Sequence, residues 1–97
     1  MSETSALAQA PAALERLYRE AAAEVEAAPD IQQALERAAA LLKAIEAVYR
    51  EAGELRNRKA ARLWRERELS LAGLARIAGV SRGRAGQLVA RARKGEP

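Results

Sequence analysis

The C-terminal third of this 97-residue chain carries two short runs of apolar residues with helical spacing. Each run places its members at positions i, i+3, i+4 and i+7. The members are Leu71, Leu74, Ala75 and Ala78 in the first run and Ala85, Leu88, Val89 and Ala92 in the second. Ser70 and Ser81 precede the runs as N-cap residues, and Gly79 stands where a helix ends in a left-handed residue. The pattern predicts two short helices, the second over 82–94, joined by a tight turn.

The N-terminal half shows helical periodicity over longer stretches. Residues 1–10 have no strong periodicity, and we expect them to form a mobile tail. Pro11 suits the first turn of a helix, and an apolar face follows it. Pro29 cannot continue that helix and starts another, which has no further proline before Glu68. The short connection predicts an antiparallel helical hairpin over residues 11–53.

A stripe with coiled-coil spacing lies in the second helix of this hairpin. Its members follow one another in steps of four and three: Leu41, Ile45, Val48, Ala52 and Leu55. We expect this stripe to form the seam of a homodimer. Packing against the first helix is the alternative, and a hairpin whose free side pairs with a second subunit would combine the two. An isolated two-helix hairpin rarely buries enough apolar surface to be stable.

The apolar face changes direction just after Gly53, where Ala60, Leu63 and Trp64 form a new face. A helix that continues through Gly53 would serve the hairpin with its first half and the two short helices with its second. We favour this continuous helix over a break, although glycine inside a helix costs about 1 kcal/mol relative to alanine. The expected fold is all-α, with the hairpin followed by a trihelical domain over 54–94 and a frayed end at 95–97.

The composition narrows the function. The chain has no histidine and no cysteine, which removes the usual general base, the commonest metal ligands and any disulfide. We therefore expect no enzyme, no metal and no cofactor. No apolar run is long enough to span a bilayer, and the N-terminus lacks the basic region of a signal peptide. We expect a location in a bacterial cytoplasm, at the nucleoid.

The charge is divided sharply between the two halves of the chain. Residues 1–53 carry five Lys and Arg against nine Asp and Glu, a net charge of −4. Residues 54–97 carry twelve against four, a net charge of +8. A polyanion would suit the second half as a partner.

The outer face of the helix over 82–94 combines small residues, one amide and a basic margin. Glycine and alanine let a helix approach the floor of the DNA major groove, glutamine pairs with adenine, and arginine pairs with guanine or contacts phosphates. The candidate DNA contacts are Ser81, Arg82, Gly83, Arg84, Gly86, Gln87, Ala90, Arg91 and Lys94, with Arg62 from the preceding basic helix. A solvated polar face on a structural helix is the alternative.

The arrangement Leu74-Ala75-x3-Gly79-Val80-Ser81, with Ala85 and Leu88 downstream, resembles the helix-turn-helix of bacterial DNA-binding proteins. The trihelical and sigma-factor-region-4-like domains of high-GC, actinobacterial-like bacteria are the nearest in shape. The resemblance covers roughly residues 54–94 and implies that Ser81, Arg82, Gly83 and Gln87 face bases. Ala85 departs from the family pattern, which more usually has Val or Ile there.

These observations together predict a dimeric transcriptional regulator that binds double-stranded DNA sequence-specifically. One alternative is a helical adaptor that docks on an acidic partner such as RNA polymerase. Another is an architectural or partition protein that binds DNA without sequence preference.

Overall fold

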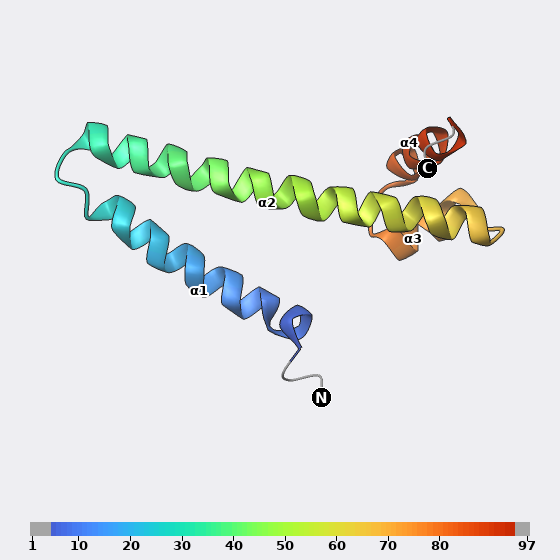
Figure 1. Cartoon of the computed structure of the whole chain (residues 1–97), viewed down its shortest axis with the longest axis horizontal. Coiled ribbons are helices and arrows are strands. Elements are labelled where there is room, and N and C mark those ends of the chain that lie inside the picture. Colours follow the sequence, from blue (N-terminus) through green and yellow to red (C-terminus); the bar gives the residue numbers. More distant parts are fainter. Residues whose placement is uncertain (1–4, 95–97) are drawn as a thin grey trace. The chain divides into compact units, whose positions relative to one another are not determined.

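The computed structural model describes residues 5–94, which form four α-helices and contain no strand (Figure 1). In chain order they are α1 (Ala6–Glu26), α2 (Ile31–Glu66), α3 (Leu71–Ala78) and α4 (Arg82–Arg93). The all-α class predicted from the sequence is therefore confirmed. The chain divides into two compact units, Met1–Ala47 and Val48–Pro97, and α2 contributes to both.

α1 begins earlier than the sequence pattern indicated. Ser5 is its N-cap, since the Ala8 N–H donates to the Ser5 Oγ over 3.1 Å. The expectation of a tail is therefore wrong for residues 6–10, and residues 1–4 lie outside the described residues. Pro11 sits inside the helix rather than in its first turn. The alanine-rich segment after Ser5 has high helix propensity, and this outweighs the single backbone hydrogen bond that Pro11 cannot donate.

A four-residue turn, residues 27–30, joins α1 to α2 as a hairpin. Asp30 caps α2, because the Gln33 N–H donates to the Asp30 Oδ1 over 2.8 Å. Arg37 reaches back across the turn and donates from Nη1 to the Glu24 carbonyl over 2.7 Å. The last turn of α1 has no basic residue of its own, so Arg37 supplies the cation that the negative end of a helix dipole favours.

The described residues of the first unit include no buried side chain. Near the turn, small and aliphatic residues of α1, of the turn itself and of α2 are half-buried. These are Ala21 and Val25 of α1, Ala28 of the turn, and Ala34, Ala38 and Leu41 of α2. Farther along α1, Leu14 and Leu17 remain 60% and 63% exposed. The hairpin thus forms without a core of its own.

α2 runs unbroken through Gly53, as the sequence favoured, and ends two residues before Glu68. Its last part belongs to the second unit, where Ala60 is buried and Leu63 and Trp64 pack against the core. This is the change of face that the spacing after Gly53 predicts.

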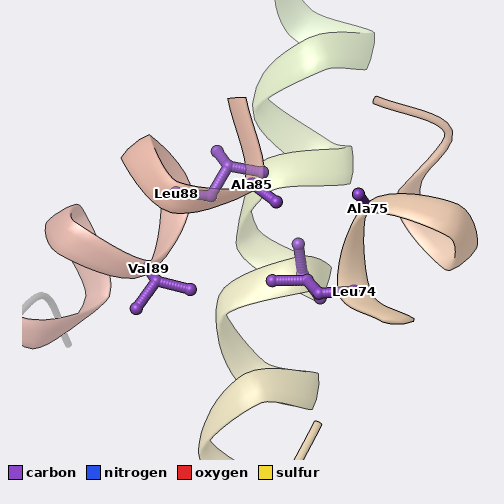
Figure 2. Packing of buried hydrophobic residues seen from close by; sticks show 6 residues of the cluster. Leu74, Ala75, Ala85, Leu88 and Val89 are labelled. Atoms are coloured by element: carbon purple, nitrogen blue, oxygen red, sulfur yellow. The ribbon is translucent and has the colours of Figure 1, made fainter. Parts of the chain in front are cut away.

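The core of the second unit draws on three helices. Ala60 comes from α2, Leu74 and Ala75 come from α3, and the rest come from α4: Ala85, Leu88 and Val89. Figure 2 shows Leu74 extending from α3 into the space beside α2 and α4. Leu74 is 1% exposed and is the largest fully buried side chain. Ala85 is fully buried, which fits the short side chain at this crossing of the helices.

The capping residues of α3 and α4 are those that the sequence predicts. The Gly73 N–H donates to the Ser70 Oγ over 3.0 Å, and the Arg84 N–H donates to the Ser81 Oγ over 3.1 Å. Gly79 ends α3 at φ 73°, a left-handed conformation that residues with a Cβ rarely adopt. Ser70 thus caps the start of α3, while Gly79 and Ser81 lie in the turn that joins α3 to α4.

Candidate nucleic-acid interface

α4 turns an apolar face inward and leaves a polar, basic face accessible. Ala85, Leu88, Val89 and Ala92 are its buried residues. The residues predicted to contact DNA all lie outside this face, and all except the half-buried Gly86 are exposed. They are Ser81, Arg82, Gly83, Arg84, Gly86, Gln87, Ala90, Arg91 and Lys94, together with Arg62 on α2.

The first turn of α4 concentrates positive charge. Arg82 and Arg84 lie in this turn, which contains no acidic residue. The helix dipole also places partial positive charge there, so cations at this end are unfavourable by about 0.3–1 kcal/mol each. An anion bound at this end would relieve the repulsion.

Gln87 is held by a neighbour on its own helix. The Arg84 Nη1 donates to the Gln87 Oε1 over 3.0 Å. An amide oxygen has two lone pairs and the amide nitrogen has two hydrogens, so Gln87 keeps one acceptor site and both donors for an external partner. This contact links Gln87, the one amide side chain of this face, to an arginine and restricts the rotamers of Gln87.

The two glycines of α4 are not required by packing within the chain. A Cβ built at Gly86 meets nothing within 4 Å, and one at Gly83 meets only the Ser81 Oγ at 3.9 Å. Neither residue has a positive φ. Because glycine inside a helix costs about 1 kcal/mol relative to alanine, the folded chain gains nothing from either one.

A groove of about 540 Å³ lies beside α4, where the helix meets the C-terminal part of α2. Most of its polar lining is cationic: Arg58, Lys59, Arg62, Arg65 and Arg91. Glu54 and Asn57 complete the polar lining, while Leu88 and Ala92 provide part of the apolar floor. Of the predicted DNA contacts, the groove brings together Arg62 and Arg91, and the others lie outside its lining.

Arg62 already has an acidic partner one turn along α2. Its Nε donates to the Glu66 Oε2 over 2.7 Å. This hydrogen bond and the charge of the arginine lower the pKa of Glu66, and the carboxylate in turn raises the pKa of Arg62. Both side chains are more than half exposed, so the pair adds little to the stability of the fold.

Sequence reasoning noted the basic character of α2 but singled out Arg62 alone as a DNA contact. The groove adds Arg58, Lys59 and Arg65. Arg58, Arg62 and Arg65 follow one another at i, i+4 and i+7, so they share one face of the helix. That spacing was the signal that could have separated them from Arg56 and Arg67.

The stripe predicted to form a dimer seam lies on α2 and is largely accessible. Leu41 is half-buried, Ile45 is 45% exposed and Val48 is 61% exposed. Ala52 is exposed, and Leu55 is 48% exposed. The side of α2 that carries the stripe is therefore covered only near the turn.

Residues 5–94 contain no cluster of three or more acidic, histidine or cysteine side chains that could hold a metal ion. Within the same range, none of the helices has the length and apolar character needed to cross a bilayer. The chain matches no known protein family, no curated protein and no solved structure.

Proposed function

We propose that the second unit is a helix-turn-helix domain that binds double-stranded DNA, with α4 in the major groove. In this proposal α3 and the C-terminal part of α2 support α4 from behind, and the protein acts as a dimeric transcriptional regulator. Each copy would read one half-site, and the α2 stripe from Leu41 to Leu55 would hold the two copies together. The role is one of binding, without catalysis, at the nucleoid of a bacterial cytoplasm.

The observation that carries this proposal is that α4 contains residues that destabilise the helix, and no contact within the chain accounts for them. Gly83 and Gly86 weaken the helix where a Cβ would fit, and Arg82 and Arg84 oppose its dipole. Departures of this kind from local preference are expected at functional sites. A polyanion that approaches the helix backbone closely accounts for both departures at once.

The groove residues supply the second part of a DNA contact. Arg58, Arg62, Arg65 and Arg91 border the same hollow, and Lys59 extends the row. Cations at the edge of a recognition helix position a protein on the duplex by binding phosphates, whatever the base sequence. Arg62 would exchange Glu66 for a phosphate on binding.

Gln87 is the residue best suited to give base preference. Its remaining acceptor and its two donors fit the bidentate pattern that adenine offers in the major groove. Arg84, which holds the Gln87 side chain at 3.0 Å, would keep the amide oriented.

The direct test is fluorescence anisotropy with labelled duplexes at about 50 mM salt. Gly83→Glu places a carboxylate at the centre of the proposed interface, while the dipole and the better helix propensity favour it in the free protein. We expect at least about tenfold weaker binding to duplex with no loss of thermal stability. Gly53→Glu is the matched control, because a Cβ there also meets open space, and it should bind as the parent does.

Selection from random-sequence duplexes then separates specific from architectural binding. Gln87→Ala should relax the preference at one base position, while Arg62→Ala should weaken all duplexes alike and flatten the salt dependence. Failure of the parent protein to bind any duplex at low salt would overturn the proposal and leave an acidic protein as the partner to seek.

A further inference from the structure

Every residue that lines the groove beside α4 belongs to the second unit. α2 contributes residues between Glu54 and Arg65, and α4 contributes Leu88, Arg91 and Ala92. The volume of about 540 Å³ lies in the range of sites that hold small organic ligands. The groove can therefore hold a small molecule as well as border a duplex.

Positive charge in the groove far exceeds negative charge. Five cations line it, against the single carboxylate of Glu54. Of these cations only Arg62 has an ion pair within residues 5–94, and its partner Glu66 lies outside the lining. Arg58 and Arg65 share one face of α2 with Arg62, so their like charges repel one another. A multivalent anion in the groove would replace this repulsion by attraction.

The chemistry of the lining indicates which anion it suits. Four of the five cations are arginines, whose planar guanidinium group donates pairs of hydrogen bonds to phosphate oxygens. Ala61, Leu88 and Ala92 add an apolar part to the lining, and Asn57 adds an amide. A ligand that joins several phosphate groups to a small organic body, as a nucleoside triphosphate does, matches both parts of the lining.

The groove shares part of the proposed DNA interface but not its centre. Gly83 and Gln87 lie outside the lining, whereas Arg62 and Arg91 belong to it. A ligand in the groove would compete with DNA phosphates for these two arginines and leave Gln87 free. Such a ligand would lower the affinity for duplex.

We propose that the groove binds a ligand with linked phosphate groups, in a nucleotide or in a bare polyphosphate chain, and that this ligand weakens duplex binding. Arg58 and Arg65 would hold the phosphate groups together with the two shared arginines. Binding of the ligand does not depend on DNA binding, whereas its regulatory effect rests on the proposed function.

The experiment is isothermal titration calorimetry of the full chain with tripolyphosphate at about 50 mM salt. Sulfate at the same ionic strength measures the general attraction of a basic surface for anions. Arg65→Gln and Arg91→Gln should each weaken tripolyphosphate binding at least about fivefold, because each removes charge-assisted hydrogen bonds. Arg67→Gln and Arg93→Gln are the matched controls, since each removes the same charge from an exposed position two residues away and outside the lining. They should change the affinity less than about twofold.

Adenosine triphosphate in place of tripolyphosphate distinguishes the two sources of linked phosphates. Tighter binding than that of tripolyphosphate would assign a nucleotide, and equal or weaker binding would assign the bare chain. Two results would overturn the site. One is a parent protein that binds tripolyphosphate no more tightly than sulfate. The other is an equal loss of affinity in the control variants, which would indicate attraction to the whole basic surface. Circular dichroism of each variant checks that the helices remain.

Displacement of a labelled duplex, followed by fluorescence anisotropy, tests the regulatory effect. Tripolyphosphate should release the duplex at concentrations where sulfate of the same ionic strength does not. Duplex that stays on the ligand-saturated protein would refute this effect. A parent protein that binds tripolyphosphate but no duplex would refute the proposed function, and the regulatory effect with it, and leave the groove site standing. A parent protein that binds duplex but no tripolyphosphate would refute the groove site and leave the proposed function standing.

Discussion

The two units of this protein use apolar residues in opposite ways. Among the described residues, all the buried side chains belong to the second unit, where Leu74 and Leu88 close a small core. The first unit has leucines and isoleucines as large as these, but all of them except the half-buried Leu41 are exposed. The half of the chain that contains the first unit is acidic, and the half that makes most of the second is strongly basic.

This contrast separates two kinds of partner. A unit that buries its apolar residues and exposes arginines is complete as a fold and presents charge, which suits a polyanion. A unit that exposes apolar stripes is incomplete as a fold, because the hydrophobic effect drives it to find a cover. The first kind of contact should depend on salt, and the second should depend on protein concentration.

The largest expected effect comes from removing a buried side chain from the core of the second unit. Leu74→Ala should lower the free energy of unfolding of the second unit by about 2–5 kcal/mol, since it removes a fully buried leucine and leaves a cavity. The α1 change Leu14→Ala should cost far less in a monomer, because Leu14 is 60% exposed there. Chemical denaturation at low and high protein concentration measures both. The comparison fails if Leu14→Ala costs as much as Leu74→Ala at the lowest concentration.

A smaller effect is expected at the caps of the helices. Ser81→Ala should destabilise the second unit by about 0.5–2 kcal/mol, since the Arg84 N–H loses its acceptor in the first turn of α4. Ser5→Ala removes the equivalent bond from Ala8 in α1, where no core follows. We expect it to fray α1 without moving the melting of the second unit. Amide hydrogen exchange resolves the two helices, and equal protection loss in both units would contradict the division.

The parts of the fold that local chemistry controls could be predicted from the sequence. Ser70, Gly79 and Ser81 each act through a bond or dihedral angle within a few residues, so their positions alone placed α3 and α4. The predicted start of the first helix at Pro11 is wrong. Ser5 caps α1, and the alanines between Ser5 and Pro11 favour helix. The stripe on α2 could be identified from the sequence, and Leu35, Ala38 and Leu42 widen it on the adjacent side.

The side of α2 that meets α1 is a tertiary outcome. Leu41 and Leu42 are equally apolar neighbours, yet Leu41 is half-buried and Leu42 is exposed. The groove beside α4 is similar, because its arginines are visible in the sequence whereas the hollow between them depends on the packing of Leu88 and Ala92. The candidate DNA contacts on α4 could be chosen from the sequence since they are simply the positions that its apolar face leaves outside.

The smallest expected effect concerns acid, and it has the same sign in both units. The Gln33 backbone and side-chain amides bind the Asp30 carboxylate and lower its pKa below 3.8. The Arg62 hydrogen bond and charge lower the pKa of Glu66 below 4.5. A carboxyl group whose pKa is lower in the folded state binds fewer protons there, so its contribution is present above the unfolded pKa and is lost as pH falls through the folded pKa. Both groups are exposed, so the losses in stability should be slight.

Titration followed by NMR can separate the two carboxylates. Arg62→Ala should return the Glu66 midpoint toward 4.5 and leave Asp30 as it was, because the arginine is the cause only in the second unit. Asp30→Asn keeps an oxygen that can accept from the Gln33 N–H but removes the charge, so the first turn of α2 should lose its response to acid. If Arg62→Ala shifted both midpoints, the carboxylates would not be local reporters. The ends of α2 would then respond to acid as one body rather than as parts of two units.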